Sequence, residues 1–427
     1  MRSHSAVRKG FSWMSSHTVR RLFSSALLAS VLLSAMPVSA LAQTPEKETD
    51  SLTLYIAADP HYIAPTLTDH GSYFLQVVEK ADGKYMSGCE ELTDAFIEQV
   101  IREKPDALIL PGDLSFNGAR ESHLALAGKL GRVRDAGIPV LVIPGNHDLN
   151  NRMAASFHGS SFTLVDSVGP EEFAEIYADF GYRDALSRDS GSLSYVAELS
   201  EDTWALMADV NTPSAPGSVT EDFLRWVREQ LELARSQGKR VIAVSHQTLL
   251  AHTFLTAGIV IAGAERLLAL YEEYGVLCNL SGHMHIQHIQ HSESGLPDIA
   301  GGALITWPNQ FGVLTLGQAA ADYRTERVDT SSLPDFNAEA FRFLQETDRR
   351  QVAAELLSLG VEDAENALRD YMAGVNMTYI AGRGDTLDWE TPLYAQWQTV
   401  PSLYAYYLRT VREDGENHTE LSFSYSD

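Results

Sequence analysis

The stretch IPVLVIPGNHD, residues 138–148, is the part of the sequence that most directly decides the fold. It begins as an apolar run and then stops at Gly145, Asn146, His147 and Asp148. A short apolar run without alternation is typical of a strand that is buried on both faces of a sheet. Open α/β sheets bind ligands outside the carboxyl ends of such strands. The stretch therefore predicts a buried sheet with a chemical site at one strand end.

The same arrangement recurs along the chain. The runs LTLYIAAD and DALILPGD end at Asp59 and Asp113, and in the run VIAVSHQ the apolar residues are followed by His246. Apolar residues at helical spacing occupy residues 90–104 and 119–135, between the strands. A further predicted helix follows Ser218-Val219-Thr220-Glu221, which has the capping-box pattern. This alternation of strand and helix predicts a layered α/β core.

A second polar strand end follows the apolar residues 276–279. It reads LSGHMHIQH, residues 280–288, and holds three imidazoles in nine positions. The spacing of two between His283 and His285 places both on one face if the segment is extended. Two such imidazoles beside a glycine predict a metal site, provided that other parts of the chain supply partners.

The other strand ends supply those partners. The candidate metal ligands are Asp59, His61, Asp113, Asn146, His246, His283 and His285. Carboxylate, imidazole and amide ligands suit Mn, Fe or Zn, and the lack of thiolates argues against a structural zinc. Seven ligands exceed the need of one ion but suit two ions that share a carboxylate. Two ions about 3.5–4 Å apart can clamp a phosphoryl group and lower the pKa of a bridging water. Glycines at 112, 145 and 282 would let backbone and ligands approach closely.

The motifs D-x-H, G-D, G-N-H-D, H and G-H-x-H occur in this order within residues 52–318 and resemble those of the calcineurin-like metallophosphoesterase superfamily. The resemblance implies an α/β fold, a four-layer α/β/β/α sandwich, here with a smaller helical C-terminal domain. It also implies two metal sites that share Asp113. One would comprise Asp59, His61 and His285, and the other Asn146, His246 and His283. His147 would be the general acid, oriented by Asp148, and a metal-bridging hydroxide would attack the phosphorus.

Longer stretches carry a finer resemblance. AADPHYIAPTLTDHG (57–71), GDLSFNGARESH (112–123), GNHDLNN (145–151) and SHQTLLAH (245–252) resemble secreted bacterial members that are similar to cyclic-nucleotide phosphodiesterases. We therefore expect an enzyme that hydrolyses small phosphodiesters, with cyclic nucleotides as the leading substrates. The alternative is a secreted phosphomonoesterase or nucleotidase on the same metal centre. A third reading is a surface-binding protein with a vestigial site.

The first 42 residues have the pattern of a secretory signal peptide. Their five basic residues are accompanied by no acidic residue, and an apolar stretch at 22–33 precedes PVSALAQ, where cleavage is expected after Ala42 or Ala40. A retained N-terminal anchor is the alternative. We expect a secreted, periplasmic or cell-surface protein with no membrane span after cleavage. Residues 43–50 read as a linker, 51–330 as the metallophosphoesterase domain and 331–427 as a helical C-terminal domain.

Charge limits the class of partner. Removal of the five basic residues would change the net charge from −25 to −30, which disfavours long nucleic acids but not a small phosphoester held by metal ions. No protein partner is indicated. With only Cys89 and Cys278 present, a disulfide is possible but not required.

The segment from 149 to 188 interrupts the strand–helix rhythm and is expected to be a functional insertion or a packed surface loop. Its residues Phe157, His158, Phe162 and Phe173 could form an aromatic wall for a nucleobase. No pair of arginines adjoins the candidate ligands in sequence, and Arg120 and Arg152 are expected at the surface. An anionic substrate would therefore depend on the metals or on cations from distant parts of the chain.

Overall fold

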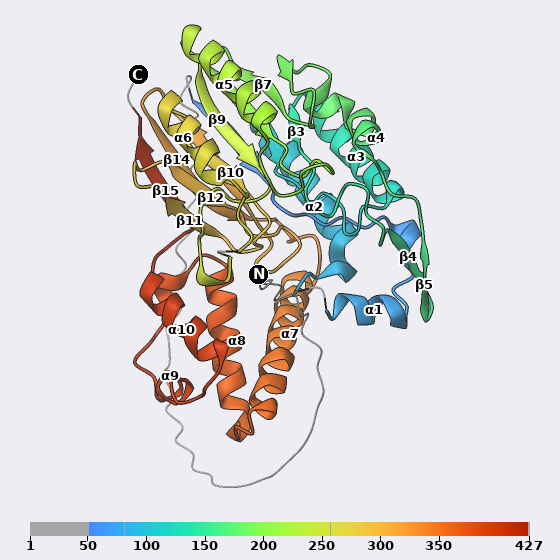
Figure 1. Cartoon of the computed structure of the whole chain (residues 1–427). Helices are drawn as coiled ribbons and strands as arrows, with labels where there is room; N and C mark the ends of the chain where they lie inside the picture. The colour runs from blue at the N-terminus through green and yellow to red at the C-terminus, as the bar shows by residue number, and fades with distance from the viewer. Residues whose placement is uncertain (1–50, 81, 257, 426–427) are drawn as a thin grey trace, which may run out of the picture.

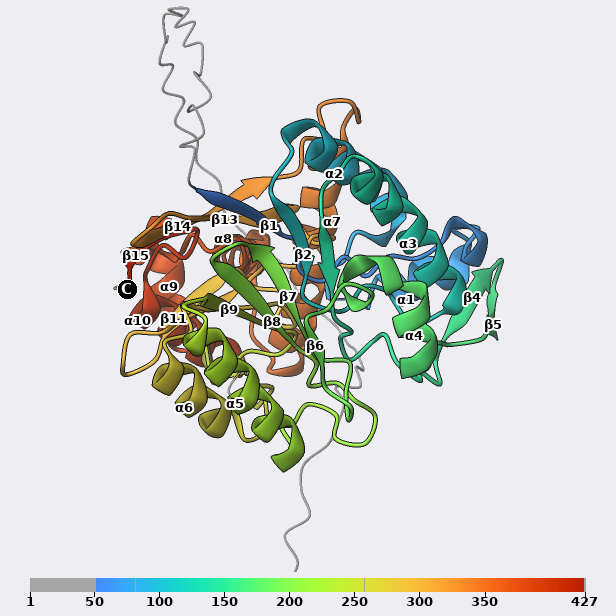
Figure 2. The ribbon, with the colours of Figure 1, turned by 90° about the horizontal axis from the view of Figure 1, so that it is seen from above.

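The computed structural model describes residues 51–80, 82–256 and 258–425, so the predicted signal peptide (1–42) and linker (43–50) lie outside the described residues. Within the described part, two large β-sheets lie face to face with helices on their outer sides (Figures 1 and 2). The predicted α/β class and four-layer sandwich are confirmed. No helix in these ranges is both long and apolar enough to cross a membrane.

The first sheet carries the strands nearest the N-terminus. Its order is β15 (Glu420–Ser424), β14 (Ala320–Arg327), β13 (Gln310–Leu316), β1 (Leu52–Ile56), β2 (Ala107–Leu110) and β3 (Val140–Val142). β1, β2 and β3 run parallel, with Leu54 opposite Ala107 and Leu108 opposite Val140. The carboxyl ends of these three strands therefore meet at one edge, where Asp59, Asp113 and Asn146 follow them.

The second sheet supplies the remaining strand ends. Its order is β11 (His288–His291), β12 (Pro297–Ala300), β10 (Asn279–Ser281), β9 (Arg240–Ser245), β8 (Thr203–Ala208), β7 (Tyr195–Ser200) and β6 (Ser187–Arg188). β8, β9, β10 and β12 are parallel. His246 follows β9 directly, and His283 follows β10, so both face the same end of the sandwich as the ligands of the first sheet.

The strands are apolar on both faces because each sheet lies between two layers. On β9, Ile242 and Val244 belong to the core between the sheets, whereas Val241 and Ala243 pack with the helices outside. Side chains alternate across a strand, so a continuous apolar run is needed when both faces are buried. This is why the apolar runs of the sequence predicted these strands well.

Helices cover both outer faces. α2 (Cys89–Glu103) and α3 (Arg120–Asp135) lie over the first sheet, and α5 (Glu221–Ser236) and α6 (Ala264–Tyr274) lie over the second (Figure 2). The helix expected after residue 218 is α5, but its capping differs from the prediction. The side chain of Thr220, not Ser218, accepts a hydrogen bond from the amide of Phe223 (3.2 Å). The hydroxyl of Ser218 instead donates to the carbonyl of Ala215.

The C-terminal helices gather at one end of the sandwich (Figure 1). They are α7 (Phe336–Ser358), α8 (Ala367–Ile380), α9 (Pro392–Trp397) and α10 (Leu403–Asp414). They form their own apolar core around Trp397, but Phe336 and Ala340 of α7 belong to the main core. The chain then returns as β15, which pairs with β14. The C-terminal segment is therefore not wholly helical, because its last strand completes the first sheet.

Other predictions need small corrections. The insertion folds into the hairpin β4 (Ala155–His158) and β5 (Ser161–Leu164), followed by α4 (Pro170–Ile176) and β6. The apolar run at residues 303–307 forms a turn rather than a strand. Cys89 and Cys278 are both free and buried. The remaining helices are α1 (Ser72–Val78) and the short turns η1 (Pro65–Leu67), η2 (Met86–Gly88), η3 (Ala178–Tyr182), η4 (Phe254–Thr256), η5 (Ala364–Asn366) and η6 (Gly384–Thr386).

Candidate metal centre and active site

Five of the candidate ligands have a strained backbone. Their φ angles lie in the left-handed region that residues other than glycine rarely adopt. They are Asp59 (φ 48°), His61 (43°), Asp113 (47°), His283 (68°) and His285 (58°). Each such residue costs roughly 1–3 kcal/mol and persists only where its surroundings fix it, which is typical of functional sites.

Hydrogen bonds between the strand ends hold these residues in their strained conformations. The amide of His61 donates to the carbonyl of Asp113 (3.0 Å), and the amide of His147 donates to Oδ1 of Asp113 (2.8 Å). The amide of His283 donates to the carboxylate of Asp59 (2.9 Å to Oδ2). The two sheets are thus joined at their carboxyl ends by hydrogen bonds among the candidate ligands.

The first cluster comprises Asp59, His61, Asp113 and His285. One ligand atom from each lies within 4.8 Å of all the others. The Nε2 atoms of His61 and His285 face each other at 2.9 Å, and His61 Nε2 lies 3.7 Å from Oδ2 of Asp113. His61 Nδ1 is buried without a hydrogen-bond partner among the described residues. Nitrogen and oxygen atoms that converge in this way suit a metal ion.

The second cluster comprises Asp113, His246 and His283, so Asp113 belongs to both clusters. His246 donates its Nδ1 proton to the carbonyl of Pro111 (2.9 Å), so the neutral ring carries its lone pair on Nε2. That Nε2 lies 2.9 Å from Oδ1 of Asn146 and 3.4 Å from Oδ1 of Asp113. Acceptor atoms therefore face one another, and a cation between them would satisfy all three.

The buried carboxylates of the site also favour the binding of cations. Asp59 and Asp113 are almost fully buried. Burial raises the pKa of Asp59 to about 8, although His246 opposes the shift. Burial lowers the pKa of His246, but Asp113 and Asp59 outweigh it and raise that pKa to about 9. Burial alone would raise the pKa of Asp113, but His246 outweighs it and holds that pKa well below its usual range. Without metal the protons are therefore held by Asp59 and His246, and divalent ions would replace them.

Two of the predicted glycines show why no side chain is tolerated here. A β-carbon at Gly112, where φ is 98°, would lie 2.6 Å from His246 Nδ1. A β-carbon at Gly145 would lie 2.2 Å from the amide nitrogen of Asp113. Both glycines therefore let the strand ends approach each other, as the sequence predicted.

His147 lies beside the clusters without joining either. Its Nε2 is 3.9 Å from Oδ2 of Asp113, and its side chain is 36% exposed. Its Nδ1–H donates to the carbonyl of Phe116 (2.9 Å). The second ring nitrogen is therefore left facing the site, where it can hold a proton for a reacting group.

Asp148 does not hydrogen-bond to the ring of His147, which it was expected to orient. The fully buried carboxylate of Asp148 accepts hydrogen bonds from the amides of Leu114 (3.0 Å), Ser115 (2.9 Å) and Gly145 (2.8 Å). It thereby joins the loops that follow β2 and β3, and the Phe116 carbonyl orients His147 instead. Asp148 is a positioning residue for the loops, because a carboxylate that accepts several backbone amides fixes their path.

Sequence reasoning missed one cation near the site. Lys84 is only 5% exposed, and burial lowers its pKa although the charges of Asp82, Asp113 and Asp59 oppose the shift. It lies in ADGKY, remote in sequence from every motif block. No local pattern marks it, because only the tertiary fold brings it toward Asp59.

The aromatic wall is only partly present. Phe157 and Phe173 are 5% and 0% exposed, so they belong to the core and cannot contact a ligand. Phe162 is 42% exposed and stacks on Tyr73 of α1, with ring centroids 5.3 Å apart. His158 is exposed at the hairpin turn. The hairpin therefore presents one aromatic ring and one imidazole to solvent.

A third cluster, His288, Asp414 and His418, lies away from the first two. The rings of His288 and His418 are stacked, with centroids 3.7 Å apart, so their nitrogen lone pairs run side by side and do not converge. The amide of Ile289 donates to Nδ1 of His418 (3.3 Å), so the Nε2 proton donates to Asp414. Hydrogen bonding explains this cluster without a metal ion.

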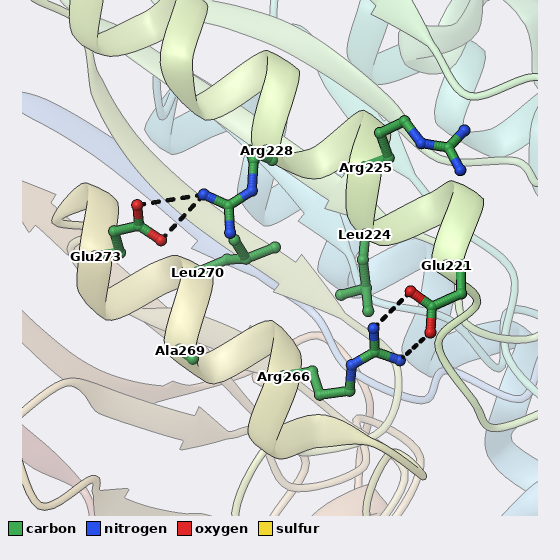
Figure 3. Close-up of a pocket in the computed structure, with 8 residues that line it drawn as sticks. All are labelled: Glu221, Leu224, Arg225, Arg228, Arg266, Ala269, Leu270 and Glu273. Atoms are coloured by element: carbon green, nitrogen blue, oxygen red, sulfur yellow. Dashed lines mark hydrogen bonds and ion pairs between the residues drawn. The ribbon is translucent and has the colours of Figure 1, made fainter.

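A groove of about 330 Å³ lies between α5 and α6 (Figure 3). Its charged side chains pair with one another, Arg266 with Glu221 and Arg228 with Glu273. None of the candidate ligands lines it. The groove is therefore separate from the metal clusters.

The chain also matches a known protein family. A model described as calcineurin-like phosphoesterase matches residues 52–287. No curated protein matches the chain. The chain is similar to a dimetal phosphatase from Danio rerio (17% identity, TM-score 0.45), with 64% of this chain and 95% of that chain covered. It is also similar to GAP50, the anchor in the inner membrane complex of Plasmodium (12%, 0.38, covering 69% and 94%). A third similar structure is a predicted phosphoesterase from Streptococcus pneumoniae (12%, 0.28, covering 66% and 92%).

Proposed function

This chain belongs to the calcineurin-like phosphoesterase family, and from that premise we propose that it is a dimetal hydrolase of small phosphodiesters, with cyclic nucleotides as the leading substrates. The observation that carries the proposal is the pair of ligand clusters that share Asp113, with His147 beside them. Shared carboxylates are typical of two-metal sites for phosphoryl chemistry.

Each cluster would hold one divalent ion. Asp59, His61 and His285 would bind the first, Asn146, His246 and His283 the second, and Asp113 would bind both. When bound, the ions supply Lewis acidity to phosphoryl oxygens and lower the pKa of water. The donor set suits Mn, Fe or Zn.

The protein's own contribution to the reaction is positioning and proton transfer. The Phe116 carbonyl accepts a hydrogen bond from Nδ1 of His147 and so orients the ring with Nε2 toward the site. Protonated His147 can then donate from Nε2 to the leaving oxygen of the ester. An alkoxide leaving group, as in a cyclic nucleotide, needs this proton. The site thus combines metal activation with an acid, as a phosphodiester with a poor leaving group requires.

Location and partners complete the proposal. The basic and apolar start of the sequence supports export, so we propose a secreted, periplasmic or cell-surface enzyme. The net charge of −25 disfavours polynucleotide substrates but not small phosphoesters that reach the metals directly.

A second candidate function is a phosphomonoesterase or nucleotidase. A monoester carries one more negative charge than a diester and is favoured by an additional cation near the phosphate. Lys84, buried close to Asp59 and Asp113 in the fold, is such a cation. This observation supports the monoester reading without weakening the case for the shared metal centre.

One rate comparison tests the proposal. Protein loaded with Mn, Fe or Zn would be assayed on bis(p-nitrophenyl) phosphate, p-nitrophenyl phosphate, cyclic nucleotides and 5′-mononucleotides, with Asp113→Ala as the inactive control. We expect kcat/KM to be higher for cyclic nucleotides than for the matching monoesters. A clear preference for 5′-mononucleotides would select the second candidate, and no turnover of any ester would refute both.

A further inference from the structure

Lys84 lies in the loop between α1 and α2, buried against the strand end that carries Asp59. Lys84 and Thr306 form an antiparallel bridge, and the amide of Tyr85 donates to the carbonyl of Ile305 (3.2 Å). Within the same turn, the amide of Leu304 donates to the carbonyl of Ala58 (2.8 Å). Turn 303–306 therefore connects the backbone of Lys84 to the residue just before Asp59.

Helix α7 holds this loop from the other side. The ring of Tyr85 packs on Phe336 and Phe343 of α7, with centroids 5.5 and 5.7 Å apart. A β-carbon at Gly83 would lie 2.3 Å from Leu344 of the same helix. The lysine is thus enclosed between the C-terminal helices and the metal centre, and only 5% of it is exposed.

The ammonium group has no close counter-ion. Among the described residues, no carboxylate lies within 4.0 Å of it, although other buried or partly buried lysines do have partners; Lys129, for example, pairs with Glu90 and Asp94. Burial lowers the pKa of Lys84, and Asp82, Asp113 and Asp59 raise it in turn. Among neighbouring charges, Lys84 has the largest effect on the pKa values of His61 and His285, which it lowers.

A buried cation without a partner is costly, so a position that keeps one is a candidate for binding an anion. A protonated lysine offers three hydrogen-bond donors and no lone pair, so it cannot bind a metal ion. Bound metal ions would repel it, and an anion placed between them would relieve that repulsion. A phosphoryl group that contacts the metals is an anion of this kind.

We propose that Lys84 binds a non-bridging oxygen of the phosphoryl group, on the side of the site formed by Asp59, His61 and His285. The inference rests on the proposed phosphoesterase function and names a residue that recognises the substrate. Because its contribution is electrostatic, it should be larger for a dianionic monoester than for a monoanionic diester. Lys84 would therefore influence how the enzyme divides its activity between the two substrate classes.

Binding of inorganic phosphate to the metal-loaded protein tests the proposal without turnover. In isothermal titration calorimetry, Lys84→Met should weaken phosphate binding by about tenfold or more while the metal content stays unchanged. Lys84→Arg should recover much of the affinity, because it keeps the charge. Lys239→Met is the matched control, since Lys239 pairs with Glu198 and lies beyond α5, before β9. Unchanged phosphate affinity in Lys84→Met would overturn the proposal.

Two further measurements separate binding from a structural role. Lys84→Met should lose more kcat/KM on p-nitrophenyl phosphate than on bis(p-nitrophenyl) phosphate, whereas equal losses with loss of metal would indicate a structural role and overturn the proposal. If Lys84→Met does not fold, a crystal structure of the metal-loaded wild type with phosphate decides. Nζ should lie about 2.7–3.2 Å from a phosphate oxygen, and a separation beyond hydrogen-bond reach would overturn the proposal. Failure of the proposed function itself would appear differently, as absence of turnover in the wild type.

Discussion

At the residue scale, His147 and Asp148 are neighbours in sequence with opposite roles. His147 is partly exposed and faces Asp113, whereas Asp148 is fully buried and binds backbone amides. The difference arises because the turn after β3 directs the ring of His147 toward the site and the carboxylate of Asp148 toward backbone amides of the loops. A sequence motif records both residues, but only the fold assigns their partners.

His147 yields a prediction about leaving groups. His147→Gln should reduce turnover of alkyl phosphodiesters by roughly 10²–10⁴ while both metals remain bound, because the residue is an acid and not a ligand. The loss should be much smaller for nitrophenyl esters, whose leaving group needs little protonation. His158→Gln, at the exposed hairpin turn, is the control. Equal losses on both kinds of ester would contradict the acid role.

The residues found from sequence share one property. Asp59 and Asp113 lie three residues after buried strands and His246 directly follows one, so the apolar runs located them and the parallel sheets brought them together. Lys84 and the carbonyl of Phe116 follow no such rule. Lys84 lies in a loop that turn 303–306 holds near the site. A backbone carbonyl, such as that of Phe116, has no pattern in the sequence. Local patterns can therefore predict ligands but not the groups that support them.

At the scale of elements, the helix pair α7–α8 buries a carboxyl group. Asp348 of α7 accepts a hydrogen bond from Asn376 of α8 (2.9 Å), and Asn376 accepts one from Tyr407 of α10. Burial raises the pKa of Asp348 to about 7, despite the opposing effect of Asn376. The group therefore stays protonated in the folded protein at a pH where it ionises in the unfolded chain.

This shift predicts a pH dependence of stability. The unfolded value is about 3.9, so between roughly pH 4 and pH 7 the folded state binds more protons than the unfolded state. Stability from this group is complete below that window and declines as the pH rises through it. Asp348→Asn removes the titration, so its melting temperature should exceed that of the wild type by more at pH 8 than at pH 5. Asp370→Asn, on the exposed side of α8, should show no such trend, and a constant or shrinking advantage for Asp348→Asn would contradict the assignment.

Element boundaries were less predictable than element types. The capping pattern pointed to Ser218, but the helix begins two residues later because Ser218 bonds to the carbonyl of Ala215. The last strand, β15, was expected within a helical region, because five partly exposed residues at a sheet edge carry little apolar signal. In both cases contacts with other parts of the chain determined the element, and the local sequence alone did not.

At the scale of the whole molecule, the C-terminal region supports the metal centre. Gln287, two residues after His285, is hydrogen-bonded to that region. Its amide donates to the carbonyl of Ile380 (3.0 Å), and its side chain donates to the carbonyl of His418 (2.8 Å). The loop that carries His283 and His285 is thus held by the end of α8 and the segment before β15.

This support predicts a long-range effect on metal binding. Gln287→Ala would leave the carbonyl of His418 and the buried hydroxyl of Tyr323, which donates to Gln287 (3.1 Å), without these partners. Such a loss costs about 1–3 kcal/mol. We expect a lower melting temperature and a severalfold weaker affinity for the first metal, measured by competition with a chelator. Gln290→Ala, on the neighbouring strand β11, should retain the wild-type affinity. If both variants bind metal equally well, the C-terminal region does not support the site.

The central claim is that two metal ions share Asp113. Anomalous scattering from crystals grown with Mn²⁺ tests it most directly, because the method locates each ion without reference to substrate or rate. We predict two peaks about 3.5–4 Å apart, with Asp113 between them, one beside Asp59, His61 and His285 and the other beside Asn146, His246 and His283. A single peak, or two peaks that do not both contact Asp113, would contradict the account.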